Sequence, residues 1–179
     1  MSHPAVFFDR DGTLMRDAAY ASRPEQVELL PGAADAVRAL AADGFLVLLI
    51  TNQSGIGRGY YSPDDYERVH ARLVELLAAS GARLDGEYHC PHAPDAGCDC
   101  RKPGTALFER AARDHDVALS HSWCLGDRWR DVAPAQVLGA TGLLVASAST
   151  PPEDLLRAEE SGRLVRSLAD AVRRIRHER

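Results

Sequence analysis

The sequence contains no long hydrophobic run and no basic export signal. Every apolar segment is shorter than the roughly 18 residues that a membrane-spanning helix needs, so we expect no membrane partner. The N-terminus passes directly into Val6-Phe7-Phe8 and then into charged residues, which does not fit a secretory signal peptide. These absences predict a cytoplasmic protein.

Positive charge is not gathered into a patch that could bind nucleic acid. The formal net charge is −5, with basic and acidic residues interspersed. The one basic-rich run, residues 173–179, also contains Glu178 and fits the solvated end of a helix. We therefore expect no nucleic-acid partner.

The length and the apolar content fit one folded unit. The chain has 179 residues, of which 45% are hydrophobic, so it can bury a core but has little room for a second domain. We expect a single domain over residues 1–179. Nothing in the sequence indicates self-association, so we expect a monomer.

Apolar runs of strand length alternate with helical patterns. The expected strands cover residues 5–8, 45–50, 123–125 and 142–146. The expected helices cover residues 32–43, 62–80, 104–115 and 167–175. This alternation predicts an α/β fold of the Rossmann-like type, a doubly wound parallel sheet with helices on both faces. Ligands bind such sheets outside the carboxyl ends of the strands.

The segment Asp-Arg-Asp-Gly-Thr at residues 9–13 follows the first expected strand. Two carboxylates at a strand end, Asp9 and Asp11, can face one pocket. One of them could then attack phosphorus while the other handles the proton of the leaving group. Taken alone, the segment could also be a turn with capping acids.

Three further polar segments follow strands or begin helices, and each is ambiguous alone. Residues 51–55 (Thr-Asn-Gln-Ser-Gly) offer a hydroxyl and backbone N–H groups for phosphate oxygens, or form an ordinary loop. Residues 101–103 (Arg-Lys-Pro) offer cations for anionic groups, or lie on the surface. Residues 126–131 carry two acids that suit Mg²⁺, or begin a helix. Together with residues 9–13, they supply the nucleophile, the cation site and the Lys clamp that phosphoryl transfer needs.

Cysteine use indicates a metal rather than disulfides. The chain has four cysteines, and Cys90, Cys98 and Cys100 lie within a short loop together with His92. Three thiolates and one imidazole form a closed tetrahedral set, which predicts a structural zinc site in a loop over residues 90–100. The alternative is a group of reduced surface cysteines beside a chance histidine. The loop leads directly into Arg101 and Lys102, so zinc would fix both cations.

The four motifs, in this order over residues 9–131, resemble those of the haloacid dehalogenase-like phosphatase superfamily. The resemblance implies that Asp9 is the nucleophile, forming an aspartyl-phosphate, and that Asp11 is the general acid and base. It also implies catalytic roles for Thr51 and Lys102. Dehalogenases of the superfamily lack the acid at the Asp11 position, so its presence favours phosphate esters.

The same resemblance implies a catalytic Mg²⁺. The ion would be held by Asp9, by the backbone carbonyl of Asp11 and by Asp127, with Asp131 as a supporting acid. The segment between the first motif and the next helix, residues 17–30, has the composition of a loop. We therefore expect no large cap domain and a rather open site.

Within the superfamily, the chain resembles the D-glycero-D-manno-heptose 1,7-bisphosphate 7-phosphatases over nearly its whole length. The matching stretches are residues 8–13, 17–20, 30–32, 51–56, 58–59, 90–92, 98–103 and 126–127. The family removes one phosphate from a sugar bisphosphate to supply nucleotide-activated heptose for cell-surface polysaccharides such as lipopolysaccharide. The resemblance implies these substrate contacts: Asp17, Tyr20, Thr51, Asn52, Gln53, Ser54, Arg101, Lys102 and Arg128.

Two alternatives stay open at this point. Only five residues separate His92 from Cys98, a short spacing that is similar to the histidinol-phosphate phosphatase branch. The segments around Tyr20 and over residues 53–59 favour the heptose branch instead. A non-catalytic zinc-binding module is the other alternative, but such a module has no use for the complete set of catalytic carboxylates and Lys102.

Overall fold

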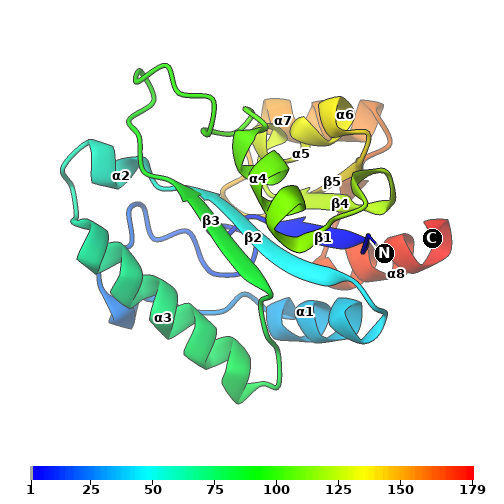
Figure 1. Cartoon of the computed structure of the whole chain (residues 1–179), viewed down its shortest axis with the longest axis horizontal. Coiled ribbons are helices and arrows are strands. Elements are labelled where there is room, and N and C mark those ends of the chain that lie inside the picture. Colours follow the sequence, from blue (N-terminus) through cyan, green and yellow to red (C-terminus); the bar gives the residue numbers. More distant parts are fainter. Residues whose placement is uncertain (1) are drawn as a thin grey trace.

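The computed structural model describes residues 2–179, and its centre is a parallel β-sheet (Figure 1). The six strands lie in the order β3-β2-β1-β4-β5-β6, and all neighbouring pairs are parallel. The strands are β1 (Ala5–Phe8), β2 (Leu46–Asn52), β3 (Gly86–Cys90), β4 (Trp123–Gly126), β5 (Thr141–Val145) and β6 (Leu164–Val165).

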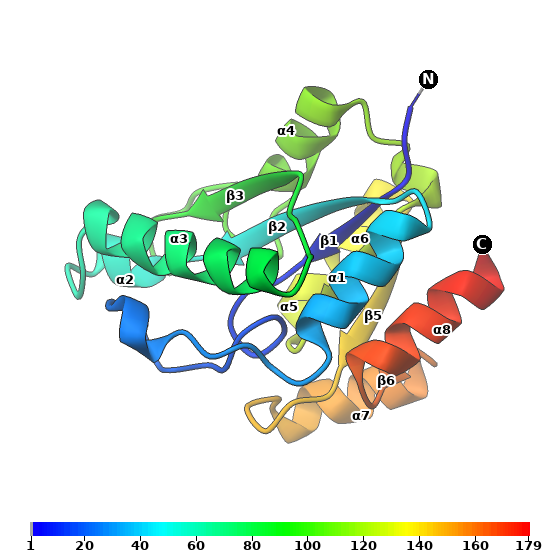
Figure 2. The ribbon, with the colours of Figure 1, turned by 90° about the horizontal axis from the view of Figure 1, so that it is seen from below.

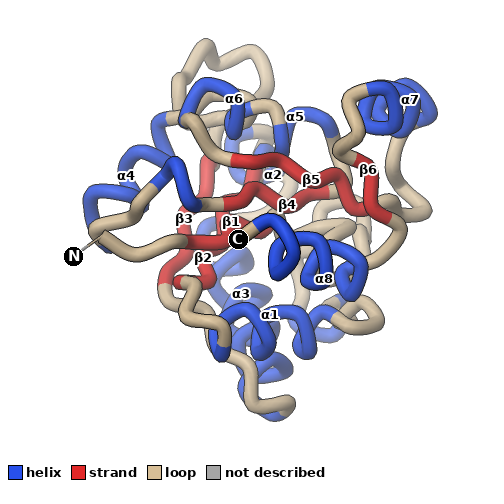
Figure 3. The backbone as a smooth tube through the Cα atoms, turned by 90° about the vertical axis from the view of Figure 1, so that its right-hand side faces the viewer, coloured by secondary structure: helices blue, strands red, loops and turns tan. Residues whose placement is uncertain are grey.

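Helices cover both faces of this sheet, as expected for a doubly wound α/β fold (Figure 3). One face carries α1 (Ala33–Ala42), α3 (Pro63–Ala79) and α8 (Leu168–Glu178), which lie side by side in Figure 2. The opposite face carries α4 (Ala106–His115), α5 (Trp129–Val132), α6 (Pro134–Leu138) and α7 (Pro152–Glu160). The short α2 (Ser54–Gly57) follows β2 directly.

The central strands are apolar throughout because helices bury them on both sides. In β1, Val6 and Phe8 pack into the core beneath α1, α3 and α8. Ala5 and Phe7 point to the other face, where the Phe7 ring meets Phe108 of α4 at a centroid distance of 5.3 Å. This rigid centre fixes where the strands end, and therefore where the polar motifs lie.

The expected strands and helices are all present, with ends shifted by a few residues. Several elements were not predicted, among them the edge strands β3 and β6 and the helix α7. The edge strand β3 is only half-buried and has the polar sequence Gly-Glu-Tyr-His-Cys, so it carries no apolar run. The edge strand β6 has two residues. Helix α7 begins at Pro152, and the proline is tolerated in the first turn because its missing N–H costs nothing there.

No cap domain interrupts the described part of the chain after β1. The segment from β1 to α1 contains only a single 3₁₀ turn, Pro24–Gln26. Within residues 2–179, none of the helices is both long and apolar enough to cross a membrane.

Candidate active site

The polar motifs that follow β1 and β4 meet at the point where the order of the strands changes direction. The chain continues from β1 to β2 on one side, whereas β4 leads to β5 on the other side. Such a switch point leaves a crevice at the carboxyl ends of the two central strands. Asp9 directly follows β1 and Asp127 directly follows β4, so both carboxylates lie at this crevice.

Lys102 lies at the centre of the buried charges. Its Nζ is 2.7 Å from Asp9 Oδ1 and 2.8 Å from Asp131 Oδ1, and it also donates to the backbone carbonyl of Ile50 at 2.7 Å. These contacts use all three protons of the ammonium group. Burial and the nearby Asp131 carboxylate raise the pKa of Asp9 to about 7, although Lys102 acts in the opposite direction.

Carboxylate oxygens of Asp9, Asp127 and Asp131 lie within 4.8 Å of one another. Asp127 Oδ2 accepts hydrogen bonds from Ser147 and Ser149, each at 2.8 Å, whereas its Oδ1 is buried and has no partner. A hard divalent cation fits this donor set, because it would complete the coordination of the buried oxygen and offset the excess negative charge.

Gly12 makes room for Asp127. The φ angle of Gly12 is 82°, and a Cβ at this position would lie 2.3 Å from Asp127 Oδ2. Any larger residue would therefore meet both backbone strain and a direct clash with the carboxylate. The glycine of the first motif is thus needed to bring the backbone of residues 11–12 close to the Asp127 carboxylate.

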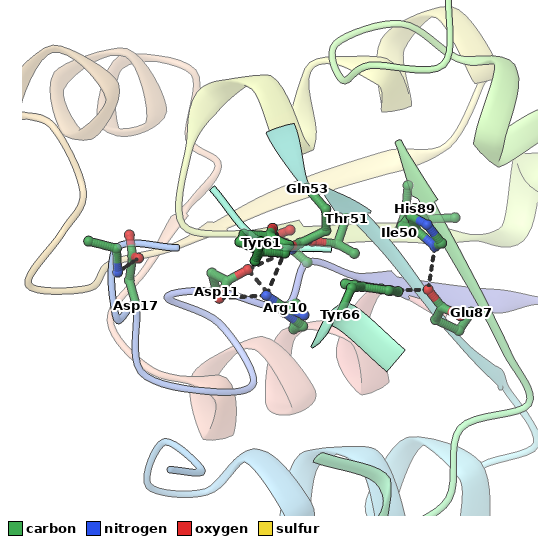
Figure 4. Close-up of polar contacts among 12 residues, drawn as sticks. Arg10, Asp11, Asp17, Ile50, Thr51, Gln53, Tyr61, Tyr66, Glu87 and His89 are labelled. Carbon is green, nitrogen blue, oxygen red and sulfur yellow. Dashed lines mark hydrogen bonds and ion pairs between the residues drawn. The ribbon is translucent and has the colours of Figure 1, made fainter. Parts of the chain in front are cut away.

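Asp11 is held by two neighbours that come from different loops (Figure 4). It accepts hydrogen bonds from Arg10 Nε at 3.0 Å and Arg10 Nη2 at 3.2 Å. It also accepts one from Gln53 Nε2 at 2.9 Å, and the same Gln53 nitrogen donates to Thr51 Oγ1 at 2.8 Å. Arg10 is 1% exposed, so this ion pair is largely shielded from water.

A cavity of about 420 Å³ opens beside Asp11. Its walls come from the loops that follow β1, β2, β3 and β4. The lining residues are Arg10, Asp11, Asp17, Ala19, Tyr20, Asn52, Gln53, Ser54, Arg58, Tyr61, Pro94, Arg101 and Arg130. The cavity is therefore polar and carries more arginines than acids.

Asn52 fixes the backbone of Lys102. Its Oδ1 accepts a hydrogen bond from the Lys102 N–H at 2.9 Å, and its Nδ2 donates to the Lys102 carbonyl at 3.1 Å. Arg101, the neighbouring residue, lines the cavity, and its Nη1 is buried without a partner. The end of β2 thus places both cations of the third motif.

One aromatic side chain of the cavity lining, Tyr20, contacts a second aromatic ring. Tyr20 meets Tyr60 edge to face at a centroid distance of 4.9 Å. Asp17 accepts a hydrogen bond from the Ala19 N–H at 3.0 Å and lies 3.7 Å from Arg128. Ala19 and Tyr20 both have positive φ angles, 49° and 72°.

The cysteine loop brings its four predicted ligands together. Cys90 Sγ lies 3.6 Å from Cys98 Sγ and 3.2 Å from Cys100 Sγ, and His92 Nδ1 lies 3.2 Å from Cys100 Sγ. A tetrahedral zinc with Zn–S bonds of about 2.3 Å needs sulfur atoms roughly 3.7 Å apart, so the arrangement fits this ion. The neighbouring His89 is not part of the cluster, because it packs on Tyr66 and contacts Glu87.

Comparison with known proteins identifies the family to which the chain belongs. The family model described as HAD-hydrolase-like matches residues 99–171. A D-glycero-D-manno-heptose-1,7-bisphosphate 7-phosphatase from Thermosynechococcus vestitus is 45% identical over 156 residues, which cover 81% of this chain and 80% of the relative. The chain belongs to the heptose bisphosphate phosphatase family. It is a phosphatase of the haloacid dehalogenase-like superfamily, as its four motifs predicted.

Two further members of the heptose bisphosphate phosphatase family are similar along most of their length. The D-glycero-beta-D-manno-heptose-1,7-bisphosphate 7-phosphatase of Helicobacter pylori strain J99 is 42% identical over 132 residues, which cover 73% of this chain and 76% of the relative. The crystal structure of D,D-heptose 1,7-bisphosphate phosphatase from B. bronchiseptica, complexed with magnesium and phosphate, superposes with a TM-score of 0.87. That chain is 32% identical, and the match covers 98% of this chain and 99% of the other.

The residues that the family resemblance singled out fall into two groups. Asp9, Thr51 and Lys102 are buried and do not line the cavity, whereas Asp11 lines it. The predicted contacts Asp17, Tyr20, Asn52, Gln53, Ser54 and Arg101 also line the cavity. Arg128 does not, and lies 3.6 Å from Asp127 Oδ2 instead.

Several site residues were not predicted. Tyr61 and two arginines of the cavity, Arg58 and Arg130, were not among the predicted contacts, although Arg58 lies in a family-like stretch and Arg130 in the fourth motif, at the start of α5. The serines that bind Asp127 follow the end of β5, at the same edge of the sheet as the motifs. Their position after a strand is the signal that could have found them. Trp129 lies outside the cavity lining and packs against the Arg157 guanidinium at 4.3 Å.

Proposed function

We propose that this phosphatase removes the 7-phosphate of D-glycero-D-manno-heptose 1,7-bisphosphate in the supply of nucleotide-activated heptose. The observation that carries the proposal is a complete phosphoryl-transfer set beside an arginine-lined cavity. Arg58, Arg101 and Arg130 line that cavity in addition to Arg10, which is paired with Asp11. This excess of positive charge suits a substrate that keeps a second phosphate, and the relatives named above act on such a bisphosphate.

The proposed reaction has two steps, each with one proton transfer. Asp9 attacks phosphorus, the bond from phosphorus to the sugar oxygen breaks, and that oxygen takes the proton of Asp11. A water molecule then attacks the aspartyl-phosphate, Asp11 takes a proton from the water, and inorganic phosphate leaves Asp9. Lys102 neutralises negative charge on Asp9 and on the phosphoryl oxygens.

Mg²⁺ is the proposed cofactor. Asp9, Asp127 and the backbone carbonyl of Asp11 would hold the ion, with Asp131 in support through its contacts to Lys102 and to the Arg128 N–H. When bound, the ion would draw negative charge from the phosphoryl oxygens. The unpartnered Asp127 Oδ1 supports this assignment.

Zn²⁺ is proposed as a purely structural ion at Cys90, His92, Cys98 and Cys100. Four protein ligands leave no open position for water or substrate. We further propose that the enzyme is a single-domain, cytoplasmic monomer with a sugar phosphate as its only partner.

A direct comparison of substrates tests the proposal. Phosphate release with Mg²⁺ is measured from heptose 1,7-bisphosphate and from histidinol phosphate, the substrate that the short zinc loop left open. We expect kcat/KM to favour the bisphosphate by at least about tenfold, because the cavity arginines gain a second anionic partner only with this substrate. A preference for histidinol phosphate would contradict the proposal.

A further inference from the structure

The Gln53 side chain is fully engaged within the protein. Its Oε1 accepts hydrogen bonds from Arg10 Nη2 at 2.9 Å and from the Tyr61 hydroxyl at 2.6 Å. Its Nε2 donates to Asp11 Oδ2 at 2.9 Å and to Thr51 Oγ1 at 2.8 Å. An amide has two donors and two acceptor sites, so no capacity is left for a substrate.

The orientation of this amide follows from its neighbours. Arg10 can only donate, so the Gln53 atom that faces it must be the oxygen. With the oxygen turned toward Arg10, the Gln53 nitrogen faces Asp11 and Thr51. The Tyr61 hydroxyl must then donate to the oxygen, and burial raises the pKa of Tyr61 to about 12, which keeps its proton in place.

Arg10 is held from behind by a second set of contacts (Figure 4). Its guanidinium lies over the Tyr66 ring at 5.4 Å from the centroid. The Tyr66 hydroxyl donates to Glu87 of β3, and Glu87 also contacts His89 Nδ1 at 3.1 Å. Because Arg10 is buried and anchored on two sides, it presents a fixed donor edge to Asp11.

We propose that Tyr61, Gln53 and Arg10 are positioning residues that hold the Asp11 carboxyl group in line with the leaving-group oxygen. The inference rests on the general-acid role of Asp11 in the proposed function. It gives Gln53 a role other than the direct substrate contact that the family resemblance implies. Of the three residues, Tyr61 acts on Asp11 only through the Gln53 amide, to which its hydroxyl donates.

The proposal predicts a dependence on the leaving group. An alkoxide from a sugar needs the proton of Asp11 to depart, whereas p-nitrophenolate is stable without it. The first step, which sets kcat/KM, is therefore sensitive to the position of Asp11 only for alkyl phosphates. A misplaced Asp11 would lower the ratio of kcat/KM for an alkyl phosphate to that for p-nitrophenyl phosphate.

The test compares Tyr61→Phe with Asp11→Asn and with the wild type. Heptose 1,7-bisphosphate is the alkyl phosphate, and histidinol phosphate, also a primary alkyl ester, replaces it if the heptose is not turned over. We expect the alkyl-to-aryl ratio to fall on the order of tenfold in Tyr61→Phe and further in Asp11→Asn. Gln53→Glu, which places a carboxylate oxygen against Asp11, should also lower the ratio.

Tyr88→Phe is the matched control, because it removes a tyrosine hydroxyl that donates to Asp114 at 2.9 Å, outside the cavity lining. Its ratio should equal that of the wild type. Equal losses on both substrates in Tyr61→Phe, or no loss, would overturn the positioning role if Asp11→Asn shows the leaving-group effect. If Asp11→Asn also lacks the effect, the general-acid role fails and the inference fails with it.

Discussion

Lys102 and the three carboxylates around it form an unbalanced charge cluster. Asp9, Asp127 and Asp131 are each buried, and within residues 2–179 Lys102 is the one cation that forms ion pairs with two of them. Burial away from water, and after it the neighbouring Asp131 carboxylate, raises the pKa of Asp127 as well as that of Asp9. The cluster is therefore suited to a divalent cation and a phosphoryl group, because both of these ligands change the net charge of the site when they bind.

Asp9→Asn should abolish turnover while the fold survives. The amide has nearly the same shape as the carboxylate but cannot attack phosphorus, so phosphate release should fall at least about 10³-fold. Thermal unfolding should occur at the same or a higher temperature, because one of the crowded carboxylates is gone. Near-normal phosphate release from Asp9→Asn would contradict the nucleophile assignment.

At the residue scale, the predictable part of the site is the part encoded in short motifs. Asp9, Asp11 and Asp127 stand directly at strand ends, so local sequence is enough to place them at one edge of the sheet. Tyr61 and the serines at 147 and 149 reach the site through loop conformation. Their partners, Gln53 and Asp127, are 8 to 22 residues away in the sequence, and no periodic pattern marks the pairing.

At the scale of elements, the zinc loop connects β3 to the catalytic lysine. Cys90 ends β3 and is paired in register with Asn52 of β2. The loop returns at Cys100, two residues before Lys102, whose backbone Asn52 holds by two hydrogen bonds. The proposed zinc at one end and Asn52 at the other would thus define the path of the intervening residues.

Zinc analysis of the purified protein should give about one ion per chain, and Cys98→Ser should lose it. Phosphate release by Cys98→Ser should fall because Arg101 and Lys102 are displaced, although neither zinc nor Cys98 takes part in the reaction. Cys124→Ala is the control for the zinc content, since Cys124 is buried in β4 and is not one of the four grouped ligands. A metal-free protein with full activity would contradict the assignment of a zinc site to this loop.

The central strands and long helices follow from apolar pattern alone, whereas the edges of the sheet do not. Residues 46–50 form a continuous apolar run because β2 is covered on both faces. Glu87 and His89 lie in the edge strand β3 and serve the polar contacts behind Arg10, so β3 has no such run. An edge strand whose side chains make functional polar contacts lacks the apolar run by which the central strands can be predicted.

At the scale of the whole molecule, the topology gathers the chemistry at one edge and leaves it open. Loops after β1, β2, β3 and β4 surround the cavity, and in residues 2–179 no inserted domain follows β1 to close it. Selection of the substrate must therefore come from the loop side chains, which include Arg58, Arg101 and Arg130. This arrangement favours a small sugar that presents a phosphate to Asp9 and a second one to the arginines.

The position of the phosphate that is removed tests this account most directly. Heptose 1,7-bisphosphate is incubated with the enzyme and Mg²⁺, and phosphorus NMR identifies the products. The account predicts one equivalent of inorganic phosphate and an intact heptose 1-phosphate. Accumulation of heptose 7-phosphate, or no turnover of the bisphosphate, would contradict it.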